Sequence, residues 1–272
     1  MYHQFAQNVL SPTTAIIDER ACAYGDGFFS TIGVHDGQML WQAHHKDRIR
    51  TGVQVFGFEL DIEPLMGHLV KFASQMNEGI IKIIISRCQQ SVRGYGFQHG
   101  QCQVWIKTMP SRLYQHIQWQ KGIPTQSPIA ITTLPNALSH RVPMLSGIKL
   151  IGCPEQVLAS QRLANLSSDK PDITDALLAN VGGDWVSGTM GNVFYQLAGH
   201  WYTPPVNRSG VAGVMRAVLL DRLSIDERVL SETDLPKMTA MILTNAVRGI
   251  TPVRALYHQG QWLKLSDSTP LS

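Results

Sequence analysis

The chain has 272 residues, of which 44% are hydrophobic and 16% are charged, and its formal net charge is +3 at pH 7. This length is sufficient for two domains with ample cores, while the charged fraction lies below the usual value of about 25%. Lys and Arg are scattered rather than clustered, so we expect no nucleic-acid-binding surface. The N-terminus lacks the pattern of a signal peptide, and no apolar stretch reaches membrane-spanning length. We therefore expect a soluble, cytoplasmic protein that does not associate with membranes.

The cysteines give no sign of a metal site. The chain contains four of them, Cys22, Cys88, Cys102 and Cys153. They form no CxxC pair and share no zinc-like spacing with histidine. We expect reduced, mostly buried thiols and no bound metal.

The first half of the chain predicts a small domain of strands and helices. Residues 28–34 favour a strand, and the Asp36-Gly37 pair after them is typical of a tight hairpin. Two further segments have helical apolar spacing, and two more are strands rich in β-branched residues: 44–56 and 63–76, then 79–87 and 102–109. Between the last two strands, a glycine-containing loop presents Arg93.

The second half predicts strands interrupted by two helices. A strand at 129–134 precedes a helix at 154–166 that has proline in its first turn. Glycine turns then separate short strands, as in an antiparallel meander. The run Gly210–Arg216 leads into a second helix, whose N-terminus could bind a phosphate. We divide the chain into an N-terminal α/β domain, a linker and a C-terminal domain: 1–110, 111–123 and 124–272.

One lysine lies in an unusually apolar stretch. Lys149 stands between Ile148 and Leu150, with no carboxylate within five residues on either side. An ammonium group there must reach water or lose its hydration, and desolvation lowers a lysine pKa toward the range of a nucleophilic amine. Such a lysine suits Schiff-base chemistry. The alternative is a surface lysine on a short strand.

Six motifs follow one another along the chain: Y-G-D-G-F-F, H-K-D-R-I, the lysine stretch with E-Q-V-L, G-N-V-F followed by Y-T-P-P, G-V-A-G-V-M-R, and N-A-V-R-G-I-T-P-V. In this order they resemble the fold-type IV pyridoxal-phosphate enzymes, the family of branched-chain and D-amino acid aminotransferases and aminodeoxychorismate lyase. Within that family the lyase branch is the closest likeness, because of S-R-C-Q-Q-S-V-R-G-Y, V-A-G-V-M-R and T-N-A-V.

The resemblance implies an α/β (α+β) fold of two domains, with a smaller N-terminal α/β domain and a larger C-terminal domain of mixed sheet and barrel. Pyridoxal 5'-phosphate would lie between them, usually in a homodimer. Lys149 would carry the cofactor and Arg48 would pair with its phosphate. The backbone at Gly213-Val214 and at Asn245-Ala246 would complete the phosphate site.

On the substrate side, the resemblance implies that Arg93 faces a carboxylate, which the fork of a guanidinium suits. Phe29 and Thr31 lie on the first hairpin strand, where they either pack or line the substrate cleft.

The chain departs from the family at one cofactor position. Family members normally have a glutamate five residues before the Asn of the N-x-F motif, where it keeps the pyridine nitrogen protonated. Here Ser187 stands five residues before Asn192, and only a rebuilt loop would let Asp184 approach. A hydroxyl cannot hold that proton, so the cofactor would be a weaker electron sink. We expect transamination to suffer more than elimination, which favours a lyase.

The leading expectation is therefore a lyase of folate biosynthesis that converts 4-amino-4-deoxychorismate to 4-aminobenzoate and pyruvate. Two alternatives stay open. One is an aminotransferase for D- or branched-chain amino acids, and the other is a catalytically impaired pseudoenzyme of the same fold.

Overall fold

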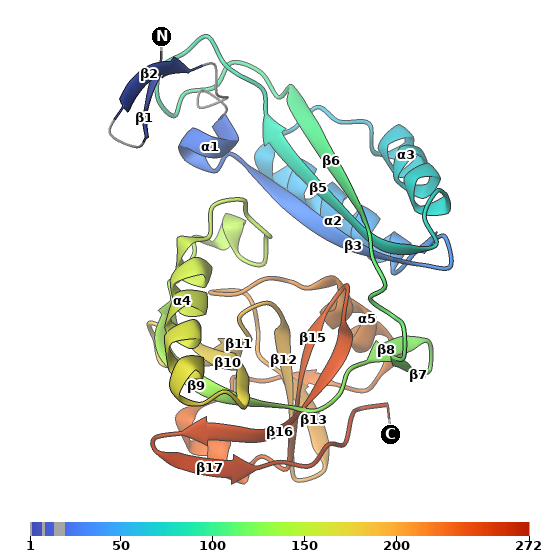
Figure 1. The fold of residues 1–272 in the computed structure, drawn as a ribbon, viewed down its shortest axis with the longest axis vertical. Coiled ribbons are helices and arrows are strands. Elements are labelled where there is room, and N and C mark those ends of the chain that lie inside the picture. The colour runs from blue at the N-terminus through green and yellow to red at the C-terminus, as the bar shows by residue number, and fades with distance from the viewer. Residues whose placement is uncertain (1, 7–8, 14–19, 272) are drawn as a thin grey trace.

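The structure is a computed structural model that describes residues 2–6, 9–13 and 20–271 (Figure 1). At the N-terminal end, β1 (Tyr2–Ala6) and β2 (Val9–Thr13) form an antiparallel pair. The remaining strands form two sheets, one above the other in Figure 1, with helices packed against each.

The first sheet is antiparallel, with the strand order β4-β3-β5-β6. Its strands are β3 (Gly27–His35), β4 (Gln38–Met39), β5 (Glu78–Arg87) and β6 (Cys102–Pro110). Between β3 and β4, Asp36 and Gly37 have φ values of 49° and 71°. Two consecutive residues with positive φ are the requirement of a type I′ turn, so the hairpin predicted from the Asp-Gly pair is confirmed.

Alternation along β3 separates a core face from a cleft face. Phe28 and Ile32 belong to the core that also holds Ile49 of helix α2 (Gln42–Phe56) and Leu69 of helix α3 (Ile62–Ser74). Because successive strand residues point to opposite faces, Phe29 and the residues in step with it point away from these helices. A short helix, α1 (Arg20–Tyr24), precedes β3.

The second sheet is mixed, and six of its strands close a ring. The strands in ring order are β9 (Ile129–Leu138), β10 (Ile173–Asn180), β11 (Trp185–Ser187), β12 (Asn192–Leu197), β15 (Ala240–Asn245) and β16 (Gly249–His258). Both pairs that β9 makes are parallel, and the other four are antiparallel. Each strand contributes to one buried core: Ile131, Leu177, Trp185, Val193, Tyr195, Met241 and Val253. The expected α/β (α+β) fold with a barrel-like sheet is thus confirmed.

Further strands extend this ring: β7 (Gln118–Gln120), β8 (Ile123–Thr125), β13 (His200–Thr203), β14 (Asp226–Glu227) and β17 (Gln261–Lys264). The antiparallel meander expected between 176 and 203 is confirmed, since β10 to β13 pair in sequence order. The first sheet ends with β6 at Pro110. Strand β7 falls inside the segment 111–123 that was expected as a linker, yet it pairs with β8.

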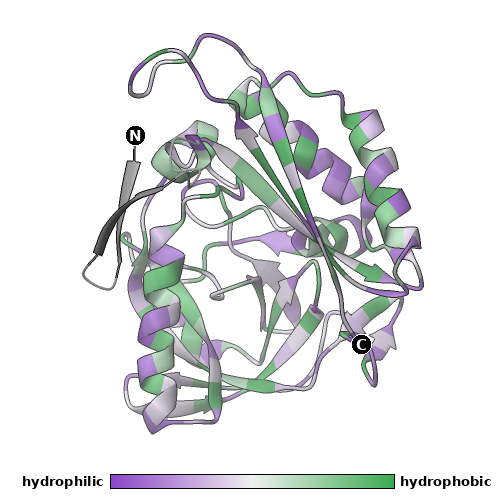
Figure 2. Ribbon diagram, turned by 45° about the horizontal axis from the view of Figure 1, so that its top comes forward, coloured by the Kyte–Doolittle hydropathy of each residue, from purple (hydrophilic) through white to green (hydrophobic). Residues whose placement is uncertain are grey.

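Two helices cover the outside of the ring. Helix α4 (Pro154–Asp169) connects the parallel strands β9 and β10 and packs through Ala159, and hydrophobic and polar residues alternate along it (Figure 2). Helix α5 (Val214–Arg222) packs Met215 against Phe194. The 3₁₀ helices η1 (Pro143–Leu145) and η2 (Glu232–Lys237) lie in connections. Across the described residues, no helix is both long and apolar enough to cross a membrane.

The lysine stretch joins the two sheets. Phe28 of β3 and Leu150 form an isolated antiparallel bridge, and the amide of Phe29 donates to the carbonyl of Lys149 at 2.9 Å. The amide of Ile151 donates in turn to the carbonyl of Gly27 at 3.2 Å. This segment is therefore fixed along β3, and Lys149 lies where the sheets meet.

Candidate active site

The Lys149 amine lies over an aromatic ring and among cations. Its Nζ is 4.6 Å from the ring centroid of Phe29, and the Nζ of Lys82 is 5.2 Å from the same centroid. Burial is the largest cause that lowers the pKa of Lys149, to about 8, and the neighbouring Arg48, Lys82 and Arg141 act in the same direction. The desolvated lysine expected from the sequence thus has a physical basis in the fold.

This environment predicts the pH dependence of Lys149 reactivity. With a pKa of about 8, the uncharged amine makes up about a tenth of the group at pH 7, against about one part in 3,000 for an ordinary lysine. The neutral fraction rises with pH through 8 and then levels off. We expect the rate of borohydride-trappable adduct formation with added pyridoxal phosphate to level off near pH 9. A rate that still climbs steeply above pH 10 would indicate an ordinary lysine.

Arg48 brings three distant segments together at this amine. It lies half-buried on α2, and its Nη2 donates to the carbonyl of Ala212 at 2.9 Å. Desolvation lowers the pKa of Arg48 to about 10, so it remains a cation at neutral pH. The amide of Ala212 donates to the carbonyl of Gly147, two residues before Lys149, at 2.8 Å. A partly desolvated cation thus stands beside both the lysine stretch and the start of α5.

The start of α5 has the features of an anion site. Gly213 is the N-cap, Val214 is the first helical residue, and no side chain caps the helix. The first amides of an uncapped helix, at the positive end of its dipole, are suited to binding a phosphate. Glycine is required here, because a Cβ at position 213 would lie 1.9 Å from Oδ1 of Asn192.

Replacing Gly213 with alanine should therefore disrupt this site. Asn192 must move, and its Nδ2 would lose the hydrogen bond to the carbonyl of Val211, now 2.8 Å long. We expect a loss of about 1–3 kcal/mol in the free energy of unfolding. Gly67→Ala on α3 is a matched control, because its Cβ would meet nothing within 4 Å. Equal melting temperatures for the two variants would contradict the predicted clash.

Three polar side chains share one face of the ring beside this helix. Ser187 pairs across the sheet with Asn192, and Asn192 pairs with Thr244 on its other side. Direct cross-strand partners point to the same face of a sheet. Because the side chain of Asn192 donates to the carbonyl of Val211, just before α5, all three side chains lie on the face turned toward the start of α5. The hydroxyls of Ser187 and Thr244 are buried and have no hydrogen-bond partner among the described residues. Since buried polar groups are normally paired, these two hydroxyls indicate a ligand.

Two carboxylates of this region are bonded to residues other than Ser187. Asp184 accepts a hydrogen bond from the amide side chain of Asn180 at 3.4 Å. The Asp175 carboxylate accepts from the hydroxyl and the amide of Thr189, at 2.7 and 3.0 Å. Among the described residues, neither Asp184 nor any other carboxylate accepts a hydrogen bond from the Ser187 hydroxyl.

The second predicted phosphate contact lies at the end of β15. The side-chain oxygen of Asn245 accepts from the amides of Val247 and Arg248, at 3.1 and 2.8 Å. This turn, which also contains Ala246, follows directly after Thr244. Asn245 and Thr244 line a cavity of about 250 Å³. The side-chain oxygen of Asn245 is thus occupied by its own turn, which leaves the backbone amides at Asn245 and Ala246 as the predicted phosphate donors.

The predicted substrate residues separate into two places. Phe29 and Thr31 lie on the cleft face of the first sheet, where Thr31 pairs directly with Lys82. Arg93 lies exposed in the loop between β5 and β6, and no contact with Lys149 is shown. The sequence reasoning missed Lys82, although a single cation inside the strand I-I-K-I-I-I was a usable signal.

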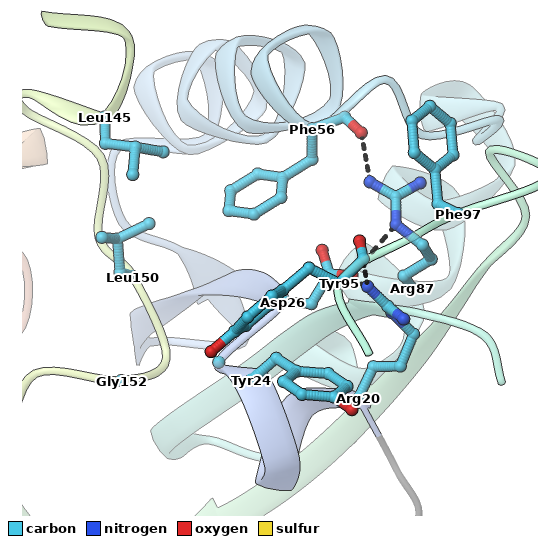
Figure 3. A pocket seen from close by; sticks show the side chains of 11 residues that line it. Arg20, Tyr24, Asp26, Phe56, Arg87, Tyr95, Phe97, Leu145, Leu150 and Gly152 are labelled. Atoms are coloured by element: carbon cyan, nitrogen blue, oxygen red, sulfur yellow. Dashed lines mark hydrogen bonds and ion pairs between the residues drawn. The ribbon is translucent and has the colours of Figure 1, made fainter. Parts of the chain in front are cut away.

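A larger cavity, of about 360 Å³, borders the lysine stretch at Leu150 and Gly152 (Figure 3). Its polar wall is Asp26, which accepts from Nε of Arg20 at 2.7 Å and from Nε of Arg87 at 3.0 Å. Its aromatic wall consists of Tyr24, Phe56, Tyr95 and Phe97. Neither Lys149 nor Arg93 is among the residues that line this cavity.

The residues around Lys149 fit pyridoxal phosphate. A half-buried arginine and an uncapped helix suit its phosphate, two unpaired hydroxyls suit its polar ring atoms, and a partly neutral lysine suits its aldehyde.

Comparison with known proteins agrees with this fit. The family pattern for amino-transferase class IV matches residues 27–256. An aminodeoxychorismate lyase from Vibrio harveyi is 28% identical in an alignment of 262 positions that covers 93% of this chain and 91% of that protein. The crystal structure of 4-amino-4-deoxychorismate lyase from Pseudomonas aeruginosa has a TM-score of 0.76 at 27% identity, and the match covers 96% of this chain and 93% of that one.

A more distant structure shares the fold. The PLP-bound form of a hypothetical aminotransferase from Mycobacterium tuberculosis has a TM-score of 0.70 at 16% identity, and the match covers 94% of this chain and 89% of that one. Because the family pattern spans most of the described residues, and the fold agrees with these structures, the chain belongs to the amino-transferase class IV family, the fold-type IV pyridoxal-phosphate enzymes.

Proposed function

We propose that this protein is a pyridoxal-phosphate-dependent aminodeoxychorismate lyase, which releases pyruvate from 4-amino-4-deoxychorismate and leaves 4-aminobenzoate. The observation that carries the proposal is the Lys149 amine, which burial and three cations keep partly neutral beside the uncapped start of α5. The two lyases described above, at 28% and 27% identity, support the choice of reaction.

The surroundings of Ser187 favour elimination over transamination. When bound, the cofactor would supply an electron sink for the carbon that carries the substrate amine. Ser187 offers a hydroxyl where a carboxylate would hold the ring nitrogen protonated, and Asp184 is paired elsewhere. A weak sink suffices for a reaction that aromatisation drives, whereas transamination needs a longer-lived carbanion.

Within this proposal each side chain has a defined task. Lys149 holds the cofactor and then, as a free amine, takes the ring proton beside the substrate nitrogen. Arg48 and the amides at Gly213-Val214 hold the phosphate. Lys82 and the ring of Phe29 face the same amine, so a substrate that is both cyclic and anionic suits the cleft.

The test is a direct comparison of two activities in the purified protein with added pyridoxal phosphate. Formation of pyruvate and 4-aminobenzoate in equal amounts from 4-amino-4-deoxychorismate is the expected result. Transfer of amino groups from D- or branched-chain amino acids to 2-oxo acids, without pyruvate release, would replace the proposal with an aminotransferase. If neither activity appears, the chain is a pseudoenzyme.

We also propose that the protein is a homodimer. Several large apolar side chains are exposed on either side of the lysine stretch, Val142, Met144, Val157 and Leu158, and such surfaces mark contact regions. Light scattering should give twice the 30.2 kDa mass of one chain. A mass of one chain at micromolar concentration would contradict this proposal.

A further inference from the structure

The segment 147–149, which ends at Lys149, belongs to no helix or strand, yet each of its three carbonyls accepts a hydrogen bond. The carbonyl of Gly147 accepts from Ala212, and that of Lys149 accepts from Phe29. These two contacts are made by backbone amides, which no ordinary substitution removes. They fix the segment to the start of α5 on one side and to β3 on the other.

One charged side chain completes this arrangement. Nη1 of Arg141 donates to the carbonyl of Ile148, directly before the lysine, at 2.9 Å. Its Nη2 contacts Sγ of Cys153 at 3.3 Å and Oε1 of Glu155 at 3.1 Å. The side chain of Arg141 is 10% exposed, so its pairing with Glu155 is largely shielded from water. A single guanidinium therefore joins the residue before Lys149 to the residues that begin α4.

We infer that Arg141 is the positioning residue for Lys149, with Glu155 orienting the guanidinium so that it fixes both ends of the lysine segment. The inference rests on the proposed role of Lys149 as the cofactor-binding lysine. Arg141 bonds Ile148 and Cys153 through two different nitrogens of its planar fork, whereas the three donors of a lysine ammonium share one nitrogen and lack this fixed spacing. Arg141 makes no contact with the amine itself and acts only through the backbone and through its charge.

The charge of Arg141 provides a second effect that can be measured separately. Lys149 faces Arg48 from α2, Lys82 from β5, Arg141, and the opposing Cys153. Removing the positive charge at 141 should raise the pKa of Lys149, and removing the carboxylate at 155 should lower it further. Different substitutions can therefore separate the effect of Arg141 on the position of Lys149 from its effect on the pKa of Lys149.

The experiment compares full-length wild type with Arg141→Lys, Arg141→Met and Glu155→Gln. Each is mixed with pyridoxal phosphate from pH 6 to 10, and the rate of adduct formation is followed by absorbance. Borohydride reduction and peptide mapping then locate the adduct. Arg162→Met on α4 is the control, since Arg162 is exposed and donates only a long hydrogen bond among the described residues, to the Pro135 carbonyl at 3.5 Å.

If Arg141 positions the lysine, both substitutions at 141 slow adduct formation about 10- to 100-fold, once the rate is divided by the fraction of neutral Lys149 amine. Arg141→Lys should keep the wild-type pH midpoint, because its charge remains. Arg141→Met should move the midpoint to higher pH, and Glu155→Gln should move it to lower pH with an intermediate rate. Glu155→Gln and Arg141→Lys decide the question if Arg141→Met proves unstable.

Three results would overturn the inference, and only one of them also removes the proposed function. If all the variants form the Lys149 adduct at the wild-type rate, Arg141 has no positioning role, while the proposed function stands. If wild type forms no adduct on Lys149, both the proposed function and the inference fail. A change of midpoint without a slower rate would reduce Arg141 to an electrostatic neighbour, which also contradicts positioning.

Discussion

Lys149→Ala is expected to lower turnover by at least about 10³-fold and to abolish the borohydride-fixed cofactor adduct, because no other group replaces the amine. The fold should survive. The backbone contacts of Lys149 to Phe29 do not involve the side chain, and truncation removes a buried cation rather than core volume. We therefore expect the melting temperature of the unliganded protein to change by a few degrees at most.

The measurement is mass spectrometry of the reduced protein, together with thermal unfolding. Lys82→Met is the matched control, because Lys82 lies over the same Phe29 ring. This control should keep the adduct on Lys149. An adduct of full yield in Lys149→Ala would show that another lysine carries the cofactor, and loss of folding would make Lys149 a structural residue.

The second large effect is expected at Arg48. Arg48→Met removes the half-buried cation beside α5 and its bond to Ala212, so the affinity for pyridoxal phosphate should fall by about 2–4 kcal/mol, or about 30- to 1,000-fold. Because Arg48 also lowers the pKa of Lys149, the pH midpoint of adduct formation should rise in the same variant.

Equilibrium titration with pyridoxal phosphate measures the loss. Arg50→Met provides the control, because Arg50 lies on the same helix but is exposed and pairs with Asp47. If pyridoxal without its phosphate lost as much affinity as the phosphate form in Arg48→Met, the arginine would not be a phosphate contact.

Local physical chemistry made several features predictable from the sequence. The Asp36-Gly37 pair specifies its hairpin because both residues tolerate positive φ. The apolar run around Lys149 predicted a desolvated amine, and the glycines before Val214 predicted an uncapped helix start. Each depends on residues that are neighbours in the chain.

The residues that lie beside one another in the site could not be predicted from the sequence in the same way. Strand alternation predicts that Ser187 and Val186 point to opposite faces of the sheet. It does not predict that Ser187 pairs with Asn192, or that Asn192 pairs with Thr244. That arrangement depends on which strands pair and in what register, and the ring joins strands far apart in sequence. The unpaired hydroxyls at this face became visible only when the sheet closed.

The sequence by itself therefore determined the local elements and the apolar neighbours of Lys149 in the chain, because hydration and turn geometry act over a few residues. Tertiary structure alone decided what surrounds that lysine. It brought Arg48 to Ala212, Lys82 to the ring of Phe29, and Arg141 to the carbonyl of Ile148. Such contacts arise from the packing of one sheet against the other, since nothing in the spacing of two distant residues specifies that their side chains will meet.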